Sequence, residues 1–221
     1  MDKRGWKIVY LSQCLLNQNL RFPGIAVESG VITELIEALI QHGIGIETLP
    51  CLERVGWGGV KRKTFYKYFP IVSKNIGSIK FPLIKLILRI WIMNYKKVCK
   101  KEAKKVISQL KDYINSGYSI LGMITTNDSP TCGFTKTMNL LELSSKYKEL
   151  GIKDEIFENP SLENMKNIIP NLCEDGSGYF TAELNKQINK NKLDIKMVGY
   201  DIWNNSSEEI KKVIKNVGII I

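Results

Sequence analysis

Histidine is almost absent from the sequence: His42 is the only one among 221 residues. A Ser-His or Cys-His catalytic pair would have no choice of partner, and metal sites built from several histidines are excluded. His42 precedes Gly43 at the end of an expected helix, where a cation interacts favourably with the helix carbonyls. We therefore assign His42 a structural role.

Other signals are missing as well. No secretory signal peptide is visible before the first apolar run, so we expect a cytoplasmic protein whose five cysteines are reduced. There is no Cys-x-x-Cys pair and no dinucleotide-binding glycine fingerprint. The most apolar stretch, residues 81–95, is interrupted by Lys85 and Arg89 and is too short to span a bilayer. We read it as a buried or partner-facing amphipathic helix, with a membrane-surface helix as the alternative.

Acidic residues are scarce in one segment. Residues 61–105 hold fourteen lysines and arginines and one acidic residue, Glu102, which gives this segment a net charge of +13 within a chain of +10. The charge could attract RNA or an anionic surface, or it could simply form a solvated helix face. The aromatic residues at 64–69 could stack on bases, but we favour a covering element packed on the core.

Apolar runs alternate with helical patterns along the chain. Strands are expected at residues 6–12, 45–49, 119–124 and 195–199, and helices at 28–41, 81–95, around Cys99 to Tyr113, 139–149, 161–170, from an N-cap at Thr181 to 189, and from Ser206 onward. This alternation predicts a single three-layer, Rossmann-like α/β domain over residues 1–221, with a mainly parallel sheet flanked by helices. Residues 61–117 form a basic, largely helical insertion in it.

Three cysteines each follow an expected strand. Cys14 comes after the first strand, Cys51 after the second, and Cys132 after the third, within Asp128-Ser129-Pro130-Thr131-Cys132-Gly133. In parallel sheets, ligands bind beyond the carboxyl ends of the strands, so the fold brings these three thiols together. Cys99 has no strand before it and is read as a packed residue. Cys173 lies in a loop and stays open as a fourth ligand.

Three thiolates without a nearby histidine suit soft metals. A 4Fe–4S cluster normally uses four cysteines, and three would leave one iron open to act as a Lewis acid. A three-cysteine zinc site with an open position is a second possibility, and unrelated packed thiols are a third. Glu53 and Ser129 would stand near such a site, where a carboxyl could move protons; otherwise they are a surface carboxylate and a turn residue.

Four short blocks carry a resemblance. Ser12-Gln13-Cys14-Leu15-Leu16-Asn17, Leu49-Pro50-Cys51-Leu52-Glu53, Ser129-Pro130-Thr131-Cys132-Gly133 and Gly178-Tyr179-Phe180-Thr181-Ala182-Glu183-Leu184 are similar, in this order, to the signature blocks of the 2-thiouracil desulfidase family. Leu52 stands where that family usually has proline, and Thr131 where it has serine. The basic segment is longer than in the family's smallest members, so the chain resembles a divergent member.

The resemblance implies an oxygen-sensitive 4Fe–4S cluster held by Cys14, Cys51 and Cys132, with one iron not bound by the protein. It also implies Glu53 and Ser129 as catalytic residues and a small thiolated substrate, such as a thiouracil. Candidate substrate-binding residues in or beside the blocks are Asn17, Arg21, Arg62 and Asp128. The alternative function is a metal-binding module that holds thiolated RNA or another polyanion through residues 61–105.

Overall fold

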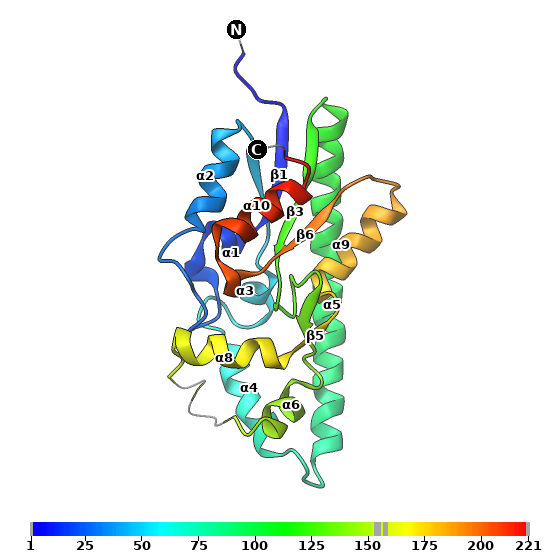
Figure 1. The fold of residues 1–221 in the computed structure, drawn as a ribbon. Coiled ribbons are helices and arrows are strands. Elements are labelled where there is room, and N and C mark those ends of the chain that lie inside the picture. Colours follow the sequence, from blue (N-terminus) through cyan, green and yellow to red (C-terminus); the bar gives the residue numbers. More distant parts are fainter. Residues whose placement is uncertain (1, 153–155, 157–158, 220–221) are drawn as a thin grey trace.

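The computed structural model is described for residues 2–152, 156 and 159–219. Figure 1 shows a parallel sheet in one half of the molecule and a mainly helical half beyond the ends of its strands. The elements in chain order are β1 (Lys7–Ser12), α1 (Gln13–Leu16), η1 (Gln18–Leu20), α2 (Thr33–Gln41), β2 (Gly45–Leu49), α3 (Leu52–Gly56), α4 (Lys63–Lys74), α5 (Phe81–Asn115), β3 (Ser119–Thr126), β4 (Lys136–Met138), α6 (Leu143–Glu149), α8 (Leu162–Leu172), β5 (Cys173–Asp175), α9 (Tyr179–Lys190), β6 (Met197–Tyr200), η2 (Ile202–Asn204) and α10 (Ser207–Asn216).

The main sheet has the strand order β2-β1-β3-β6, and each neighbouring pair is parallel. In β1, Ile8 and Tyr10 belong to the core on one face of the sheet, and Val9 and Leu11 to the core on the other face. The strand reads as a nearly continuous apolar run because both faces are buried. The predicted Rossmann-like α/β class, with a parallel sheet flanked by helices, is therefore confirmed.

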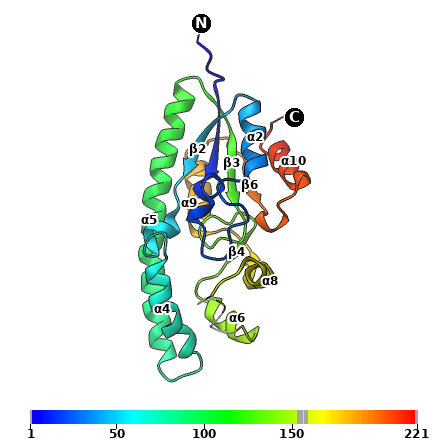
Figure 2. The same ribbon diagram turned by 90° about the vertical axis from the view of Figure 1, so that its left-hand side faces the viewer.

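Helices cover the two faces of this sheet as outer layers. The side view in Figure 2 shows α5 and α9 on one face and α2 and α10 on the other. The buried residues of α5 follow one stripe, at Ile92, Tyr95, Cys99, Ala103, Val106, Ile107 and Leu110. The placement of Cys99 in this stripe confirms that it is a packed residue.

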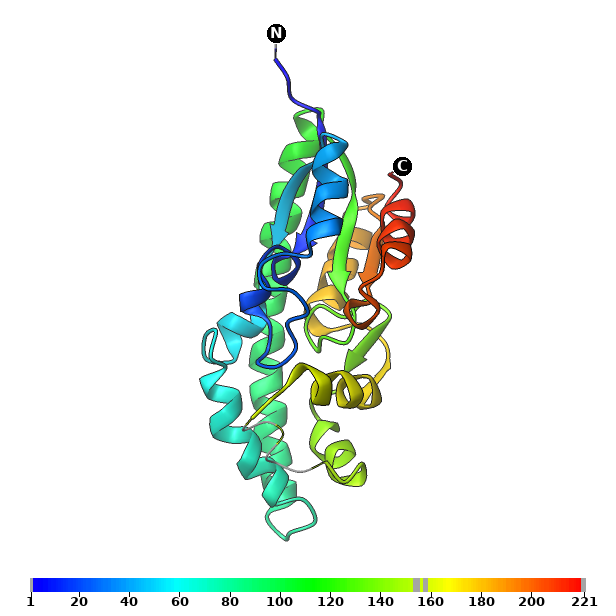
Figure 3. The same ribbon diagram turned by 60° about the vertical axis from the view of Figure 1, so that its left-hand side comes forward.

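Helix α5 is long because its two expected pieces are continuous. It runs through 35 residues, which corresponds to about 52 Å at 1.5 Å per residue. Its second half packs on the sheet, and its first half pairs with α4 beyond the carboxyl ends of the strands (Figures 1 and 3). The segment predicted as a basic helical insertion thus contains α4 and α5. Within the described ranges, no helix is both long and apolar enough to pass through a membrane.

Three helix starts differ from the sequence predictions. Helix α6 begins at Leu143 and not at residue 139, because residues 140–142 form a turn before it. Helix α2 begins at Thr33 and not at residue 28, because the carboxylate of Glu28 lies outside the helix and accepts the Thr33 backbone N–H at 3.1 Å. Thr181 is not the N-cap of α9, which begins at Tyr179 after Gly178. The first N–H groups of α9 donate to carbonyl oxygens of the turn that carries Cys132, so no side-chain cap is needed.

Two loop segments contain short elements. The glycine-rich residues 54–62 begin inside α3 and continue as turns up to Arg62. Residues 171–180 contain β5, which pairs antiparallel with β4. The aromatic stretch at 64–69 lies in α4, and Phe65, Tyr66 and Phe69 pack against the core. The interpretation of this stretch as a covering element is therefore confirmed.

Candidate functional site

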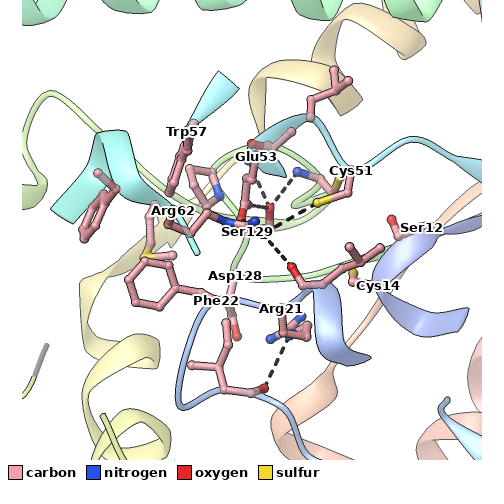
Figure 4. Close-up of a pocket in the computed structure, with 18 of the residues that line it drawn as sticks. Ser12, Cys14, Arg21, Phe22, Cys51, Glu53, Trp57, Arg62, Asp128 and Ser129 are labelled. Carbon is pink, nitrogen blue, oxygen red and sulfur yellow. Dashed lines mark hydrogen bonds and ion pairs between the residues drawn. The ribbon is translucent and has the colours of Figure 1, made fainter. Parts of the chain in front are cut away.

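The carboxyl ends of β1, β2 and β3 meet at one pocket, shown in Figure 4. Cys14 lies in the short helix α1 that follows β1, and Cys51 is the N-cap of α3, which follows β2. Cys132 lies in the turn after β3. All three line the pocket, together with Glu53 and Ser129. The fold therefore brings together Cys14, Cys51 and Cys132, which are separated by 37 and 81 positions in the chain. This is the result expected for parallel strands that end at one edge of the sheet.

The arrangement of the thiols differs from that of a single-ion site. Among the described residues, no group of three or more His, Cys, Asp or Glu is arranged to hold one metal ion. Two thiolates on one zinc ion lie about 4 Å apart, because each Zn–S bond is about 2.3 Å long. The three-cysteine zinc site is thus not preformed. A 4Fe–4S cluster is wider than one ion, so its cysteine ligands stand further apart than those of a single ion.

Burial favours the protonated form of two thiols in this pocket, those of Cys51 and Cys132. Desolvation raises the pKa of Cys51 to about 11, and the nearby Glu53 carboxylate contributes to the shift. Desolvation also raises the pKa of Cys132 well above its usual value, and Cys14 and Cys51 add to this effect. Negative charge on a neighbouring sulfur disfavours the thiolate forms of Cys51 and Cys132. A bound cation would reverse this balance and release the protons.

Polar groups surround the sulfur atoms. Cys14 Sγ and the hydroxyl of Thr126 are 3.1 Å apart, and a guanidinium N–H of Arg62 points at Cys51 Sγ from 3.7 Å. Ser12 is buried beside Cys132 and lowers the pKa of that thiol, although its hydroxyl has no partner at normal hydrogen-bond geometry within the described structure. Such donors stabilise negative charge on sulfur, so the residues present fit a thiolate-bound group.

Ser129 shapes the turn that carries Cys132. Its hydroxyl accepts the backbone N–H groups of Thr131 at 3.1 Å and Cys132 at 2.9 Å. The same hydroxyl donates to Glu53 Oε1 at 2.8 Å. The predicted catalytic pair is therefore in direct contact, although the two residues are 76 positions apart. The hydrogen bonds of this hydroxyl are fully used, so Ser129 holds the Glu53 carboxylate in place.

The turn that carries Cys132 leaves no space for a larger residue at two glycines, Gly133 within the turn and Gly178 beside it. A Cβ atom at Gly133 would collide with backbone oxygens of Lys136 and Ser129. One at Gly178 would collide with the backbone of Thr131 and Cys132. Because backbone atoms cannot give way cheaply, both positions require glycine. The close packing of α9 on this turn fixes the direction in which Cys132 points.

Arg62 is a fully buried cation at the edge of the pocket. It donates to the carbonyl oxygens of Leu20 at 2.6 Å and Gly59 at 2.9 Å, and its Nη2 lies 3.7 Å from Glu53 Oε2. A buried charge is tolerated only when it is paired and hydrogen-bonded. These contacts join α3, η1 and the glycine-rich turns. Arg62 thus supports the pocket and contributes positive charge beside Cys51.

The other predicted substrate-binding residues lie in different surroundings. Asp128 and Arg21 line the pocket, and desolvation raises the pKa of the Asp128 carboxyl. The backbone of Asp128 is left-handed, with φ of 67°. Asn17 is exposed and does not line this pocket; its side chain accepts the backbone N–H of Asn19 and so caps η1. Its substrate contact stays a prediction, and nothing in its position supports it.

Cys173 is not among the residues that line this pocket. Its thiol donates to the carbonyl oxygen of Ile169 at 3.1 Å, and it lies 3.9 Å from the carbonyl oxygen of Asp128. A donor engaged with backbone oxygens behind the turn is not positioned as a fourth ligand. The set that shares the pocket is Cys14, Cys51 and Cys132.

Aromatic residues form a wall of the pocket that the sequence analysis did not identify. Phe22, Trp57 and Phe65 line it, and the rings of Trp57 and Phe65 stack with centroids 5.7 Å apart. Tyr95 of α5 also supports the site, because its hydroxyl is 2.7 Å from that of Thr131. Each aromatic residue comes from a different segment, so no sequence spacing could have grouped them. Thr131 thus has a hydrogen-bond partner in the long helix α5.

Comparisons with known proteins add little about activity. The chain is 26% identical over 166 residues to the uncharacterized protein MJ0003 of Methanocaldococcus jannaschii, a match that covers 74% of this chain and 92% of the relative. No model of a known protein family matches the chain, and no solved structure matches it. The name of the relative states no activity, so the function is argued from the site.

The raised thiol pKa values predict how the stability of the metal-free protein depends on pH. The pKa of Cys51 is about 11 in the folded state against 9.0 as its reference value, so the unfolded chain loses this proton first as the pH rises. Folding stability should therefore be fully present below pH 9 and fall as the pH rises through about 11. Urea unfolding of the metal-free protein over this range measures it. Cys51→Ser should flatten the dependence, and an unchanged slope would contradict the assignment.

Proposed function

We propose that the protein is a desulfidase that removes sulfur from a thiolated pyrimidine or a related thioamide. The observation that carries the proposal is that Cys14, Cys51 and Cys132, from three strand ends, line one pocket together with the hydrogen-bonded pair Glu53 and Ser129. Three thiols and a carboxylate at one site are the groups that this reaction requires. The resemblance to the 2-thiouracil desulfidase family supports the same assignment.

In this proposal, Cys14, Cys51 and Cys132 hold a 4Fe–4S cluster. When bound, the cluster supplies an iron without a protein ligand, which acts as a Lewis acid for the substrate sulfur. Arg62, buried 3.7 Å from Cys51 Sγ, compensates the negative charge of the thiolates. The Thr126 hydroxyl lies 3.1 Å from Cys14 Sγ and would donate to the thiolate form of this ligand. These contacts favour the thiolate forms and hold the ligands in place.

The reaction exchanges sulfur for oxygen without a net change in oxidation state. Water adds its oxygen to the C=S carbon, the C–S bond breaks, and the sulfur leaves with two protons as hydrogen sulfide. Glu53 takes the proton of the attacking water, since a carboxylate beside the pocket can act as a general base. Ser129 orients Glu53 through the 2.8 Å hydrogen bond. No nicotinamide or flavin is required for this balance.

The remaining walls suit a flat, partly polar substrate. The rings of Phe22 and Trp57 line the pocket and can pack on a planar heterocycle. Asp128 and Arg21 line it as well and offer hydrogen bonds to ring nitrogen and oxygen atoms. The arrangement favours a thiolated ring over an extended thioamide, and the pyrimidine class is what the resemblance implies.

Anaerobic reconstitution with iron and sulfide tests the proposal. We expect about four iron and about four acid-labile sulfide atoms per chain. With 2-thiouracil or 4-thiouracil, the reconstituted protein should release hydrogen sulfide and form the oxygenated ring in equal amounts. Zinc without labile sulfide in protein purified without oxygen would reject the cluster. A full cluster without sulfide release from either compound would reject the substrate class.

A further inference from the structure

The first half of α5 exposes an apolar stripe. Its residues are Leu83, Leu86, Ile87, Ile90 and Met93, exposed by 63%, 50%, 60%, 53% and 60%. Their spacing of three and four residues places them on one face of the helix. The opposite face carries Leu88 and Trp91, which pack against the core. This part of the helix thus has two apolar faces, with Lys85 and Arg89 between them, and one of these faces has no cover in the described structure.

The stripe continues onto the turn before α5 and onto α4. Ile79 in this turn is 97% exposed, and Tyr68 and Ile71 of α4 are each 50% exposed. An apolar groove between the two helices is lined by Tyr68 and Ile71 on one side and Ile87 on the other, so the exposed residues are connected. We call residues 68–93 the hairpin tip. Figures 2 and 3 show that it extends beyond the sheet, at the end of the molecule opposite the N-terminus.

Positive charge surrounds these apolar residues. The segment 61–93 contains no aspartate or glutamate. Exposed basic side chains lie on α4, on the turn and on α5, namely Lys67, Lys74, Lys80, Arg89 and Lys96. Lys85 pairs with Glu142 at 2.9 Å. The partner of the hairpin tip must therefore accept aliphatic side chains and carry negative charge at the same place.

Two other partners fit this combination less well. A second copy of the chain would bring two equally basic hairpins together, and the like charges would oppose the contact. RNA is held by phosphate contacts together with stacking on exposed aromatic rings. Here the exposed side chains are mostly aliphatic, while Phe65 and Phe69 stack on each other with centroids 4.8 Å apart. Aliphatic residues gain little from bases or phosphates.

We infer that the hairpin tip docks on the surface of an anionic lipid bilayer. An amphipathic element lies in the interface when its apolar residues reach the acyl chains and its lysines and arginines remain at the lipid phosphates. Leu83, Ile87 and Ile90 would be the inserted residues, and Lys67, Lys80 and Arg89 would contact the headgroups. The protein would lie on the membrane without crossing it. This inference does not depend on the cysteine pocket or its chemistry.

Co-sedimentation of the full chain with lipid vesicles tests the inference. Vesicles of equal parts phosphatidylglycerol and phosphatidylcholine should bind the protein at about 0.15 M salt, and vesicles of phosphatidylcholine alone should bind at least about tenfold less. Ile87→Asp should weaken binding to the anionic vesicles by about tenfold or more. Ile40→Asp is the matched control, because Ile40 on α2 is 58% exposed and lies outside the tip. It should leave binding unchanged.

A charge series separates local from overall electrostatics. Changing Lys67, Lys80 and Arg89 to glutamate should abolish vesicle binding, while the same change at three exposed lysines elsewhere, Lys186, Lys211 and Lys215, should reduce it much less. Equal losses in the two triple variants, or equal losses in Ile87→Asp and Ile40→Asp, would overturn the inference. The inference would also be overturned if the protein bound neither kind of vesicle but formed dimers. The same holds if the protein bound RNA and Ile87→Asp left this affinity unchanged.

Discussion

Replacing Cys132 with alanine is expected to remove the cluster and to lower the desulfidase activity by at least about a hundredfold. Cys132 is almost fully buried in the turn after β3, and its thiol shares the pocket with Cys14 and Cys51. With alanine at position 132, only the thiolates of Cys14 and Cys51 remain. Two ligands are too few to hold a cluster that normally uses four cysteines. Iron and acid-labile sulfide should fall to background in the reconstituted variant. The measurement is metal content together with sulfide release under anaerobic conditions.

The chain supplies its own controls for this experiment. Cys99→Ala changes a thiol in the core of α5, and Cys173→Ala changes one that donates to the carbonyl oxygen of Ile169 outside the pocket lining. Both variants should keep iron content and turnover. Full activity in Cys132→Ala would show that the mechanism is wrong. Loss of the cluster in Cys173→Ala would instead place a fourth ligand where the structure has a backbone hydrogen bond.

Replacing Glu53 with glutamine is expected to lower turnover by about a hundredfold to ten-thousandfold, the range for loss of a general base. Glutamine keeps the size of the side chain and can still accept the hydrogen bond from Ser129, but it cannot take a proton from water. The variant should retain its cluster, because Glu53 is not one of the three ligands. Steady-state rates of sulfide release, compared at equal iron content, measure this effect.

Ser129→Ala distinguishes the proton acceptor from the residue that orients it. Removing the Ser129 hydroxyl takes away the hydrogen bond that Glu53 Oε1 accepts and the acceptor of two backbone N–H groups of the turn, while the ion pair of Glu53 with Arg62 remains. A positioning role predicts a loss of about tenfold, smaller than that of Glu53→Gln. Glu53→Asp should be more active than Glu53→Gln, because aspartate keeps the carboxylate on a side chain that is one methylene shorter. If Ser129→Ala were the more damaging change, the serine itself would be the group that handles the proton.

The strands of this fold were predictable because their signals are local. Buried parallel strands consist of apolar residues at consecutive positions, and each of the four predicted strands matches an observed one to within a few residues. The positions of Cys14, Cys51 and Cys132 at one sheet edge follow from the rule that parallel strands end on the same side. The start of α9 was predicted wrongly because carbonyl oxygens of a distant turn replace the side-chain cap expected from Thr181.

Other features of the site could not be predicted from sequence spacing. Asn17 is near Cys14 in sequence but turns outward to cap η1, while Tyr95 is distant in sequence and supports the Cys132 turn. Core packing of Phe65 became visible only through the neighbouring rings of Phe22 and Trp57. In each case the deciding contact joins segments far apart in the chain. Residue type alone does not specify such a contact.

The sequence by itself determined that this chain forms an α/β sheet and that three cysteines leave the same edge of it, because strand periodicity and strand direction are local properties. Only the tertiary structure decided that Glu53 meets Ser129, that Arg62 is buried beside Cys51, and that one apolar face of α5 has no cover in the described part of the molecule. Burial and pairing depend on which distant segments pack together. An apolar helix therefore looks the same in sequence whether its face is covered or exposed.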